Sequence, residues 1–525
     1  MRRSTLRAVV ISLFAIGSAV LQATPAQAGT GYEFPENGTE QLGRAGAWVA
    51  RASNPLATYF NAAGLAGQQS AVLLNVNLIW QKNCFDRRDS SGNVATFQNG
   101  TFRYPAEVCN TDSGTPFPNP QIALTLRIND KLGIGFGVMG PSTRGQFSYP
   151  EVAPGSYLTL NNKPGNYASP QRYLLLNDNL LFVWPQIGFG YEVIPNLRIG
   201  GSFIWGIAQM KFATNAAGLS GQGTTNADDQ FDSDVSAELT VRDWFVPGFT
   251  AGALASPHPW VDVALWYQWM DSIKAKGDAT IRGPMYEANG KLSDPSTRTV
   301  TTTTGDKAGL TAPWPMQARA GIRLHQPRNE ARPATDHAPP TGTPQFRDPI
   351  ANDRWDLELD VTWANNSQFK SLDVTFAPNT YASIRDVTHP GSQISIAMPE
   401  NASVPHYWKD AFGFRLGGDY VVIPSKIAVR AGAFYQGEAQ DPRYLHLDYV
   451  PSQMFGLNAG ATYRVGPFDL MVGFSHVFFK GLDNGGNGAT QALAGSAPYR
   501  TVQAVNGGSN SSSVTIASLG ASYRF

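Results

Sequence analysis

The sequence predicts an all-β protein, a transmembrane antiparallel β-barrel of about 14 strands with an N-terminal plug (hatch) inside its lumen. Three observations predict this fold: an export signal, segments that alternate apolar and polar residues, and connections that are alternately short and long. We expect three parts, namely a cleaved signal peptide at 1–28, a hatch at 29–68 and a transmembrane barrel at 69–525.

The start of the chain has the pattern of a secretory signal peptide. Arginines at positions 2, 3 and 7 precede an apolar run over 8–21, and Ala26-Gln27-Ala28 fits a small-x-small cleavage site. This apolar run is shorter than the ~20 residues that a membrane-spanning helix needs. We therefore predict export and cleavage after Ala28.

The next segment, 29–68, shows neither strand alternation nor a long amphipathic period, and it is rich in small residues and asparagine. Such a composition is typical of a compact irregular segment, which we place inside the barrel. Arg44 and Arg51 are candidate partners for a substrate carboxylate. The alternative, favoured because buried charges are rarely unpaired, is that they form salt bridges with acidic residues of the barrel wall. Asn61 is a further substrate-binding candidate, although its commoner role is to cap or turn the backbone.

Both cysteines of the chain, Cys84 and Cys109, lie in the long connection after the first predicted strand. Exported thiols meet an oxidising compartment, so we expect a disulfide between them. The alternative, a metal site, lacks clustered histidine partners. We expect no metal and no cofactor.

Segments with period-two alternation define the predicted wall. The last one, 514–525, places Leu519 and Tyr523 on one face and Arg524 on the other, as a strand between lipid and lumen requires. The predicted strands are 71–80, 121–128, 132–147, 182–193, 197–212, 244–255, 261–282, one within 296–324, 355–375, 408–421, 426–437, 454–464, 467–480 and 514–525.

The connections support the same fold. Short turns built on Pro, Asn, Asp and Gly alternate with long polar connections, which is how outer-membrane barrels separate periplasmic turns from extracellular loops. The exception is 325–354, a long segment where a short turn is expected. Its composition indicates a mobile insertion, or alternatively a partner-binding loop.

Charge and hydropathy restrict the partners. Basic and acidic residues number 40 each, which argues against nucleic-acid binding through a basic surface. Low charge (15%) with many aromatic residues suits a Gram-negative outer-membrane barrel in contact with lipid and lipopolysaccharide, or with detergent after extraction. We expect the C-terminal strand, which ends at Phe525, to engage the barrel-assembly machinery.

No catalytic constellation emerges. Ser475-His476 is the one pair that suggests a lipid-modifying barrel enzyme, but neighbouring strand residues point to opposite faces, so they cannot form a nucleophile–base pair. We expect the protein not to be an enzyme.

The chain resembles the FadL/TodX family of outer-membrane transporters for long-chain fatty acids and aromatic hydrocarbons. The resemblance is carried, in order, by Leu42-Gly43-Arg44-Ala45, Tyr59-Phe60-Asn61-Ala62-Ala63-Gly64-Leu65, Trp260-Val261-Asp262-Val263-Ala264, Trp355-Asp356-Leu357-Glu358-Leu359, and the segments 407–420, 429–435 and 456–463. It implies a fourteen-stranded barrel closed by a hatch that shifts to release substrate. The family's hatch motif Asn-Pro-Ala corresponds here to Asn61-Ala62-Ala63, which lacks the rigid φ of proline.

The function expected from these observations is passive transport of a hydrophobic ligand, with long-chain fatty acids favoured. The alternatives are an aromatic-hydrocarbon channel, a general porin for polar solutes, and the lipid-modifying enzyme. Aromatic residues such as Phe147, Tyr149, Tyr157, Tyr167 and Tyr173 are candidates for a capture groove or for an interfacial girdle.

Overall fold

The computed structural model describes residues 36–97, 102–105, 107–143, 145–158, 163–217, 231, 234–328, 347–385, 391–449, 451–491 and 504–525. The predicted signal peptide, hatch residues 29–35 and residues 329–346 of the predicted insertion lie outside this part of the chain. None of the helices in the described part is both long and apolar enough to cross a membrane.

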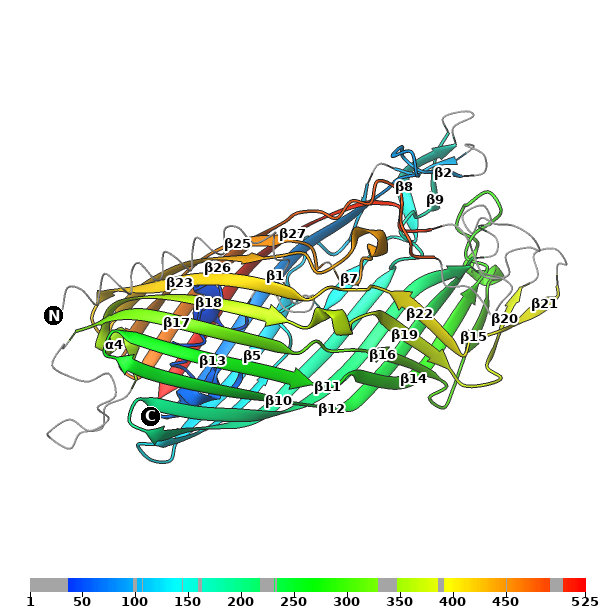
Figure 1. Ribbon diagram of the computed structural model, residues 1–525. Helices are drawn as coiled ribbons and strands as arrows, with labels where there is room; N and C mark the ends of the chain where they lie inside the picture. Colours follow the sequence, from blue (N-terminus) through cyan, green and yellow to red (C-terminus); the bar gives the residue numbers. More distant parts are fainter. Residues whose placement is uncertain are drawn as a thin grey trace.

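The wall consists of long antiparallel strands, several of them broken into two or three pieces (Figure 1). Its first half comprises β1 (Ala71–Arg87), β5 (Phe117–Arg127), β6 (Leu132–Met139) with β7 (Gln146–Ser148), β10 (Asn177–Ile194), β11 (Leu197–Ala217), β12 (Asp234–His258) and β13 (Val261–Met270) with β14 (Ile273–Gly283). Its second half comprises β15 (Thr299–Thr302), β16 (Ala308–Ala312) and β17 (Gln317–Pro327), β18 (Asp353–Ala364) with β19 (Ser371–Phe376), β22 (Asn401–Pro405) with β23 (Ala411–Ile423), β24 (Ile427–Gln436), β25 (Met454–Val465), β26 (Phe468–Phe479) and β27 (Gly508–Arg524).

The sheet closes on itself. β1 pairs with β5 on one side and with the last strand, β27, on the other, in a register from Ala71↔Arg524 to Arg87↔Gly508. Closure leaves no unpaired sheet edge facing lipid, which is the condition for a β-structure to span a bilayer. With the pieces of each broken strand taken together, the predicted barrel of 14 strands is confirmed.

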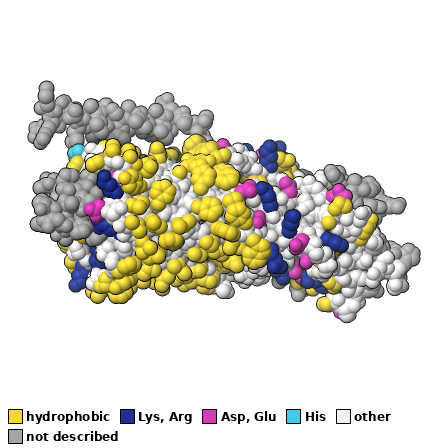
Figure 2. Space-filling model, turned by 90° about the horizontal axis from the view of Figure 1, so that it is seen from below, with side chains coloured by type: hydrophobic (Ala, Val, Ile, Leu, Met, Phe, Trp, Pro, Cys, Tyr) yellow, Lys and Arg dark blue, Asp and Glu magenta, His cyan; other side chains and the backbone are white. Residues whose placement is uncertain are grey.

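The outer face of the barrel carries an apolar belt. In β26, Leu470, Val472 and Phe474 are each about half exposed, whereas the alternate residues Met471 and Ser475 are buried. Figure 2 shows this belt as a band of hydrophobic side chains across the face seen from below, with charged side chains gathered on either side of the band. The alternation between lipid and lumen therefore follows the predicted faces.

The two ends of the barrel differ. Short turns and the C-terminus lie at one end, whereas the opposite end carries long loops with small sheets of their own (Figure 1). The loop elements are β2 (Thr96–Phe97), β3 (Phe102–Arg103), β4 (Val108–Cys109), β8 (Val152–Leu158), β9 (Lys163–Ala168), η4 (Pro295–Thr297), β20 (Tyr381–Arg385), β21 (Gln393–Ala397) and η6 (Pro442–Tyr444). By the rule for such barrels, the short-turn end is periplasmic and the long-loop end extracellular.

Four neighbouring wall strands are interrupted at the same level, between a lower group (β13, β17, β18 and β23) and an upper group (β14, β16, β19 and β22). One interruption contains two prolines around Trp314, and another forms the short helix η5 (Asn366–Gln368). At the breaks the backbone leaves strand geometry, and Trp314, Phe369 and Trp408 are buried there in the interior cluster.

A disulfide joins Cys84 of β1 to Cys109 of β4, which face each other in register. It is the predicted pairing, and it ties the returning part of the first extracellular loop to β1 of the wall.

We expect the Cys84→Ser variant to lose about 3 kcal/mol of unfolding free energy, because the bridge closes a loop of 25 residues in the unfolded chain. Denaturant unfolding of the refolded barrel measures the loss. Reducing the wild type with dithiothreitol should reproduce it. An unchanged denaturant midpoint in both the variant and the reduced wild type would contradict the prediction.

Candidate functional site: the plugged lumen

The described part of the hatch, residues 36–68, lies inside the barrel near its periplasmic end (Figure 1). It folds into three short helical pieces, α2 (Thr39–Gly43), α3 (Ala57–Phe60) and η1 (Ala62–Leu65), whose residues are all buried. Pieces this short are not stable alone in water, so contacts with the wall must hold the hatch in shape.

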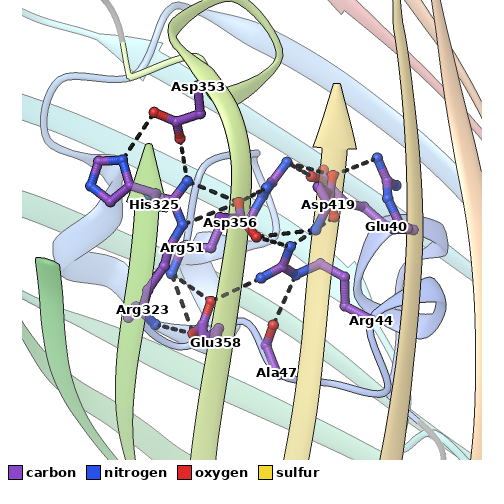
Figure 3. Close-up of polar contacts among 12 residues, drawn as sticks. Glu40, Arg44, Ala47, Arg51, Arg323, His325, Asp353, Asp356, Glu358 and Asp419 are labelled. Atoms are coloured by element: carbon purple, nitrogen blue, oxygen red, sulfur yellow. Dashed lines mark hydrogen bonds and ion pairs between the residues drawn. The ribbon is translucent and has the colours of Figure 1, made fainter. Parts of the chain in front are cut away.

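Arg44 forms the centre of an ion-pair network between hatch and wall (Figure 3). One guanidinium nitrogen lies 2.5 Å from Asp356 Oδ1 and 2.7 Å from Asp419 Oδ1, and the other lies 3.2 Å from Glu358 Oε2. Arg44 Nε also donates a hydrogen bond to the Ala47 carbonyl oxygen (3.0 Å). All five N–H donors of an arginine need partners when it is buried, and the wall supplies carboxylates for this one.

Arg51 joins the same network. It pairs with Asp356, lies 3.0 Å from Asp419 Oδ2 and reaches Glu40 of the hatch at 2.8 Å. The structure thus contains the salt bridges to the wall that the sequence favoured over substrate contact. A role in substrate binding for Arg44 or Arg51 stays a prediction.

Carboxylates of β18 also hold the hatch backbone. Glu358 Oε1 accepts a hydrogen bond from Ala50 N (2.7 Å), and Asp360 Oδ2 accepts one from Trp48 N (2.9 Å). Asp356, Glu358 and Asp360 are two residues apart, so they project from one face of the strand into the lumen. None of the three was predicted as a site residue, although the alternation of acidic and apolar residues in this strand was the available signal.

Asn61 acts as the cap of η1 in the structure. Its side chain accepts a hydrogen bond from Ala63 N (3.2 Å) and donates to the carbonyl oxygens of Val49 (3.0 Å) and Ala253 (3.2 Å). Ala62 follows as the first residue of η1, a position where proline is readily accommodated. The asparagine cap therefore forms this turn without the proline of the family motif, and a ligand contact by Asn61 stays a prediction.

The wall makes room for the hatch with glycine. Among the wall glycines that face the hatch backbone, four lie against Ala62 or Arg44, and they are Gly190, Gly200, Gly417 and Gly432. A Cβ atom at Gly200 would lie 2.4 Å from the backbone of Ala62, and one at Gly417 would lie 2.2 Å from the carbonyl oxygen of Arg44. Backbone contacts this close exclude any side chain, so we call these four residues the glycine seats.

Residues 347–352, which include α4 (Pro349–Asn352), close the periplasmic side, and we call them the rim segment. The backbone of Arg347 donates to the Gly67 carbonyl oxygen of the hatch (3.0 Å). Asp348 lies 2.5 Å from Arg464 of the wall. The end of the predicted insertion is thus an ordered clasp between hatch and rim, in contrast to the mobile insertion that we expected for the whole segment.

Glu36 anchors the start of the described hatch to two wall arginines, at 3.1 Å from Arg319 and 2.7 Å from Arg415. Burial raises the pKa of Glu36, but the charges of Arg319 and Arg415 outweigh it and hold the pKa below its ordinary value of 4.5. A carboxyl group with a lowered pKa stabilises docking above its ordinary pKa, and that contribution is lost as the pH falls through the lowered value.

We therefore expect the conductance of the reconstituted protein to stay low between about pH 8 and about pH 5 and to rise below pH 4.5 as Glu36 is protonated. Planar-bilayer recordings across this range measure it. Glu36→Gln should raise the conductance at neutral pH, because it leaves Arg319 and Arg415 without their carboxylate. A conductance that is flat at all pH values in both proteins would contradict the prediction.

Above the hatch, aromatic rings form a continuous stack that we call the aromatic column, made of Tyr59, Phe182, Trp184, Trp266 and Trp314. Tyr59 of the hatch packs on Trp184 and Trp266 with ring centroids 5.8 and 5.7 Å apart. Trp184 in turn contacts Trp314 at 5.5 Å. The column thus runs from the hatch to the level where the wall strands are interrupted.

A second group, Phe369, Trp408 and Tyr449, belongs to the same interior cluster, and we call it the outer aromatic group. Phe369 stacks on Trp408 with centroids 4.2 Å apart, and both contact Tyr449. None of these residues was predicted from the sequence to lie in the lumen, because strand breaks and a loop, rather than strand alternation, bring them inward.

The aromatic residues that the sequence singled out lie elsewhere. Phe147, Tyr149 and Tyr173 are buried in a separate cluster that also contains leucines of the extracellular loops, and Tyr167 is buried in another. They form neither an open groove nor an exposed girdle, because the loops fold over them. The side chain of Tyr157 lies outside the described residues.

Ser475 is buried, whereas the ring of His476 lies 2.8 Å from Thr515 Oγ1 on β27. The two side chains leave the strand on opposite faces, as expected for neighbours in a strand. The structure does not bring them together as a nucleophile and a base.

The C-terminal third of the chain, residues 345–525, matches the family model of outer membrane protein transport proteins (OMPP1/FadL/TodX). Over these residues the chain is similar to the FadL/TodX family. This is a family of outer-membrane transporters for hydrophobic small molecules, and the barrel described above is accordingly an outer-membrane protein. Among proteins with curated functions, none matches the sequence significantly.

Solved structures show the same fold along nearly the whole chain. A Pseudomonas aeruginosa FadL homologue has a TM-score of 0.63 at 17% identity, over 94% of this chain and 99% of that one. The P. putida toluene transporter TodX (TM-score 0.57, 13% identity) and the Ralstonia pickettii toluene transporter TbuX (TM-score 0.55, 15% identity) cover the same shares. The barrel fold of these proteins thus extends well beyond the residues that the family model matches.

Proposed function

We propose that this chain carries long-chain fatty acids across the outer membrane by passive diffusion. The observation that carries the proposal is the continuous apolar interior, from the outer aromatic group down the aromatic column to Tyr59 of the hatch. An acyl chain gains about 0.8 kcal/mol for each CH₂ that leaves water, so such an interior draws it out of the aqueous phase.

The shape of this interior favours an elongated ligand. Trp314 lies in an interrupted part of the wall, and Trp184 and Tyr59 continue the stack to the hatch, so consecutive rings offer contacts along a chain of methylenes. Movement down a concentration gradient through sites of moderate affinity needs no energy source. The hatch must shift at the end, because it closes the periplasmic side below the column.

The second candidate is an aromatic-hydrocarbon channel, because two structural relatives are toluene transporters and ring-on-ring stacking in the column also suits an aromatic ligand. Growth of a strain that lacks the gene, on oleate and on toluene as carbon sources, separates the two. Loss of growth on oleate alone supports fatty-acid transport. Loss on toluene alone supports the second candidate, and unchanged growth on both would overturn both.

We expect Trp314→Ala to reduce oleate uptake about tenfold or more, because removing one buried aromatic side chain takes away roughly 2 kcal/mol of apolar contact with the ligand. Initial uptake of labelled oleate into complemented cells measures it. The matched control is Trp244→Ala, since Trp244 is 63% exposed on the outer face. Equal oleate uptake by the two variants would show that the aromatic column does not lie on the transport pathway.

A general porin for polar solutes would need an open lumen, whereas the hatch closes this one on its periplasmic side, below the aromatic column. Swelling of liposomes in small sugars tests the difference directly. Ready sugar flux through the wild-type protein would overturn the transporter proposal.

A further inference from the structure

Two histidines and one aspartate meet near the extracellular end of the lumen. His406 follows β22, at one of the four interruptions of the wall, while His446 and Asp448 lie in the long loop between β24 and β25. All three are buried, with exposed fractions of 0%, 2% and 4%. Histidine and aspartate side chains that are buried this completely need a defined partner for every polar atom.

Their donor atoms converge. His406 Nε2 lies 3.1 and 3.0 Å from the two carboxylate oxygens of Asp448, and His446 Nδ1 lies 2.8 Å from Asp448 Oδ1. If each residue offers one ligand atom, the three ligand atoms all lie within 4.8 Å of one another. Ligand atoms bound tetrahedrally to Zn²⁺ at 2.0–2.2 Å are roughly 3.3 Å apart. The distances of 2.8 to 3.1 Å between the histidine nitrogens and the Asp448 oxygens are close to that value.

The other nitrogen of His406 fixes its tautomer. Nδ1 lies 3.0 Å from the Val404 carbonyl oxygen, and a carbonyl oxygen can only accept a hydrogen bond, so Nδ1 carries the proton. In the neutral ring, Nε2 then presents a lone pair to the Asp448 carboxylate. Two acceptors at 3.0 Å repel unless a second proton or a metal ion lies between them. Metal-binding histidines commonly have this same arrangement, with the second nitrogen donating to a backbone carbonyl.

We propose that His406, His446 and Asp448 bind a divalent transition-metal ion of the zinc class. Two imidazole nitrogens and one carboxylate suit Zn²⁺, Ni²⁺ or Cu²⁺ better than Ca²⁺ or Mg²⁺, which prefer oxygen ligands. Three protein ligands leave a fourth position for water or a ligand atom. The described residues contain one other cluster of suitable types, Cys84 and Cys109 with Glu107. Its two cysteines form the disulfide, so they are not available as metal ligands.

The position of the site indicates what the ion does. His406 belongs to the interrupted wall and lies 5.0 Å, ring to ring, from Phe369 of the outer aromatic group. His446 and Asp448 belong to an extracellular loop. A bound ion therefore fastens that loop to the wall beside the entrance of the apolar interior.

The test uses the full-length protein in detergent, stripped with EDTA and then titrated with Zn²⁺ alone, both after folding and during refolding. We expect one bound ion per chain, measured by isothermal titration and by elemental analysis after desalting. Co²⁺ substitution should give the visible absorption of a four-coordinate site. Bound Zn²⁺ should also raise the melting temperature, because it binds only the folded protein.

His446→Gln and Asp448→Asn should each weaken Zn²⁺ binding at least about 100-fold, more than the loss of an outer-sphere contact does. His258→Gln is the matched control, since His258 is exposed at a wall turn. Binding of Zn²⁺ by the wild type at only the level of the His446→Gln variant would overturn the proposal. A ¹⁵N spectrum that shows a proton on His406 Nε2 in the presence of Zn²⁺ would overturn it independently, because that proton replaces the metal.

Discussion

Replacing Asp356 with alanine should turn the plugged barrel into a conducting one. Asp356 is the carboxylate that Arg44 and Arg51 of the hatch share with Arg323 of the wall. Removing one partner of a buried ion pair typically costs 3–5 kcal/mol, because it leaves the other charge buried and uncompensated. The hatch can avoid that cost by moving out and hydrating its arginines. Single-channel conductance in planar bilayers measures the opening.

The matched control for this variant is Asp373→Ala. Asp373 is also a wall carboxylate, but its side chain accepts hydrogen bonds from the hydroxyl groups of Ser371 and Ser403 rather than holding a hatch arginine. The lumen of the Asp373→Ala variant should remain closed. If Asp356→Ala conducts no better than Asp373→Ala while both fold, the network does not hold the hatch.

Deletion of residues 29–68 should leave an assembled barrel that admits small polar solutes. The wall strands pair with one another through closure of β1 on β27, and none of these ladder contacts uses the hatch. Without the hatch, the carboxylates and arginines of the wall face water, which makes the lumen a polar channel. Liposome swelling in small sugars should therefore become fast, whereas selective uptake of oleate should be lost.

Assembly of the deletion variant is checked by heat-modifiable migration on gels, which reports a closed barrel independently of transport. The Cys84→Ser variant serves as a control for general loosening of the structure. An assembled deletion variant that excludes sugars as well as the wild type would show that something other than the hatch closes the lumen.

The wall was predictable from the sequence because its physical requirements are local. A strand between lipid and lumen must alternate, so β26 and β27 could be located from Leu470 to Phe478 and from Val514 onward, with the correct faces. Turn residues then fixed the order of short and long connections.

The lumen was much less predictable, because its contacts join distant parts of the chain. Arg44 was recognised as a charge that needs a partner, but the identity of Asp356, Glu358 and Asp419 depends on how strands from the second half surround the hatch. Likewise, Trp314 faces inward only because four strands break at one level, and no single strand's periodicity contains that information.

The histidine cluster shows the same limit. His406 and His446 are 40 positions apart, with no spacing that matches a known metal motif, and only the fold of the loop onto the wall brings them to Asp448. Scattered histidines in the sequence therefore predicted no site.

The glycine seats have a consequence for how this protein can change over time. At Gly200 and Gly417 the wall lies against the backbone of Ala62 and Arg44, so even one added methyl group would collide with the hatch main chain. A substitution there is tolerable only if the hatch changes its path at the same time. The shapes of barrel and hatch therefore depend on each other. A hatch transplanted from another barrel should dock only if the wall strands that contact it are transplanted as well.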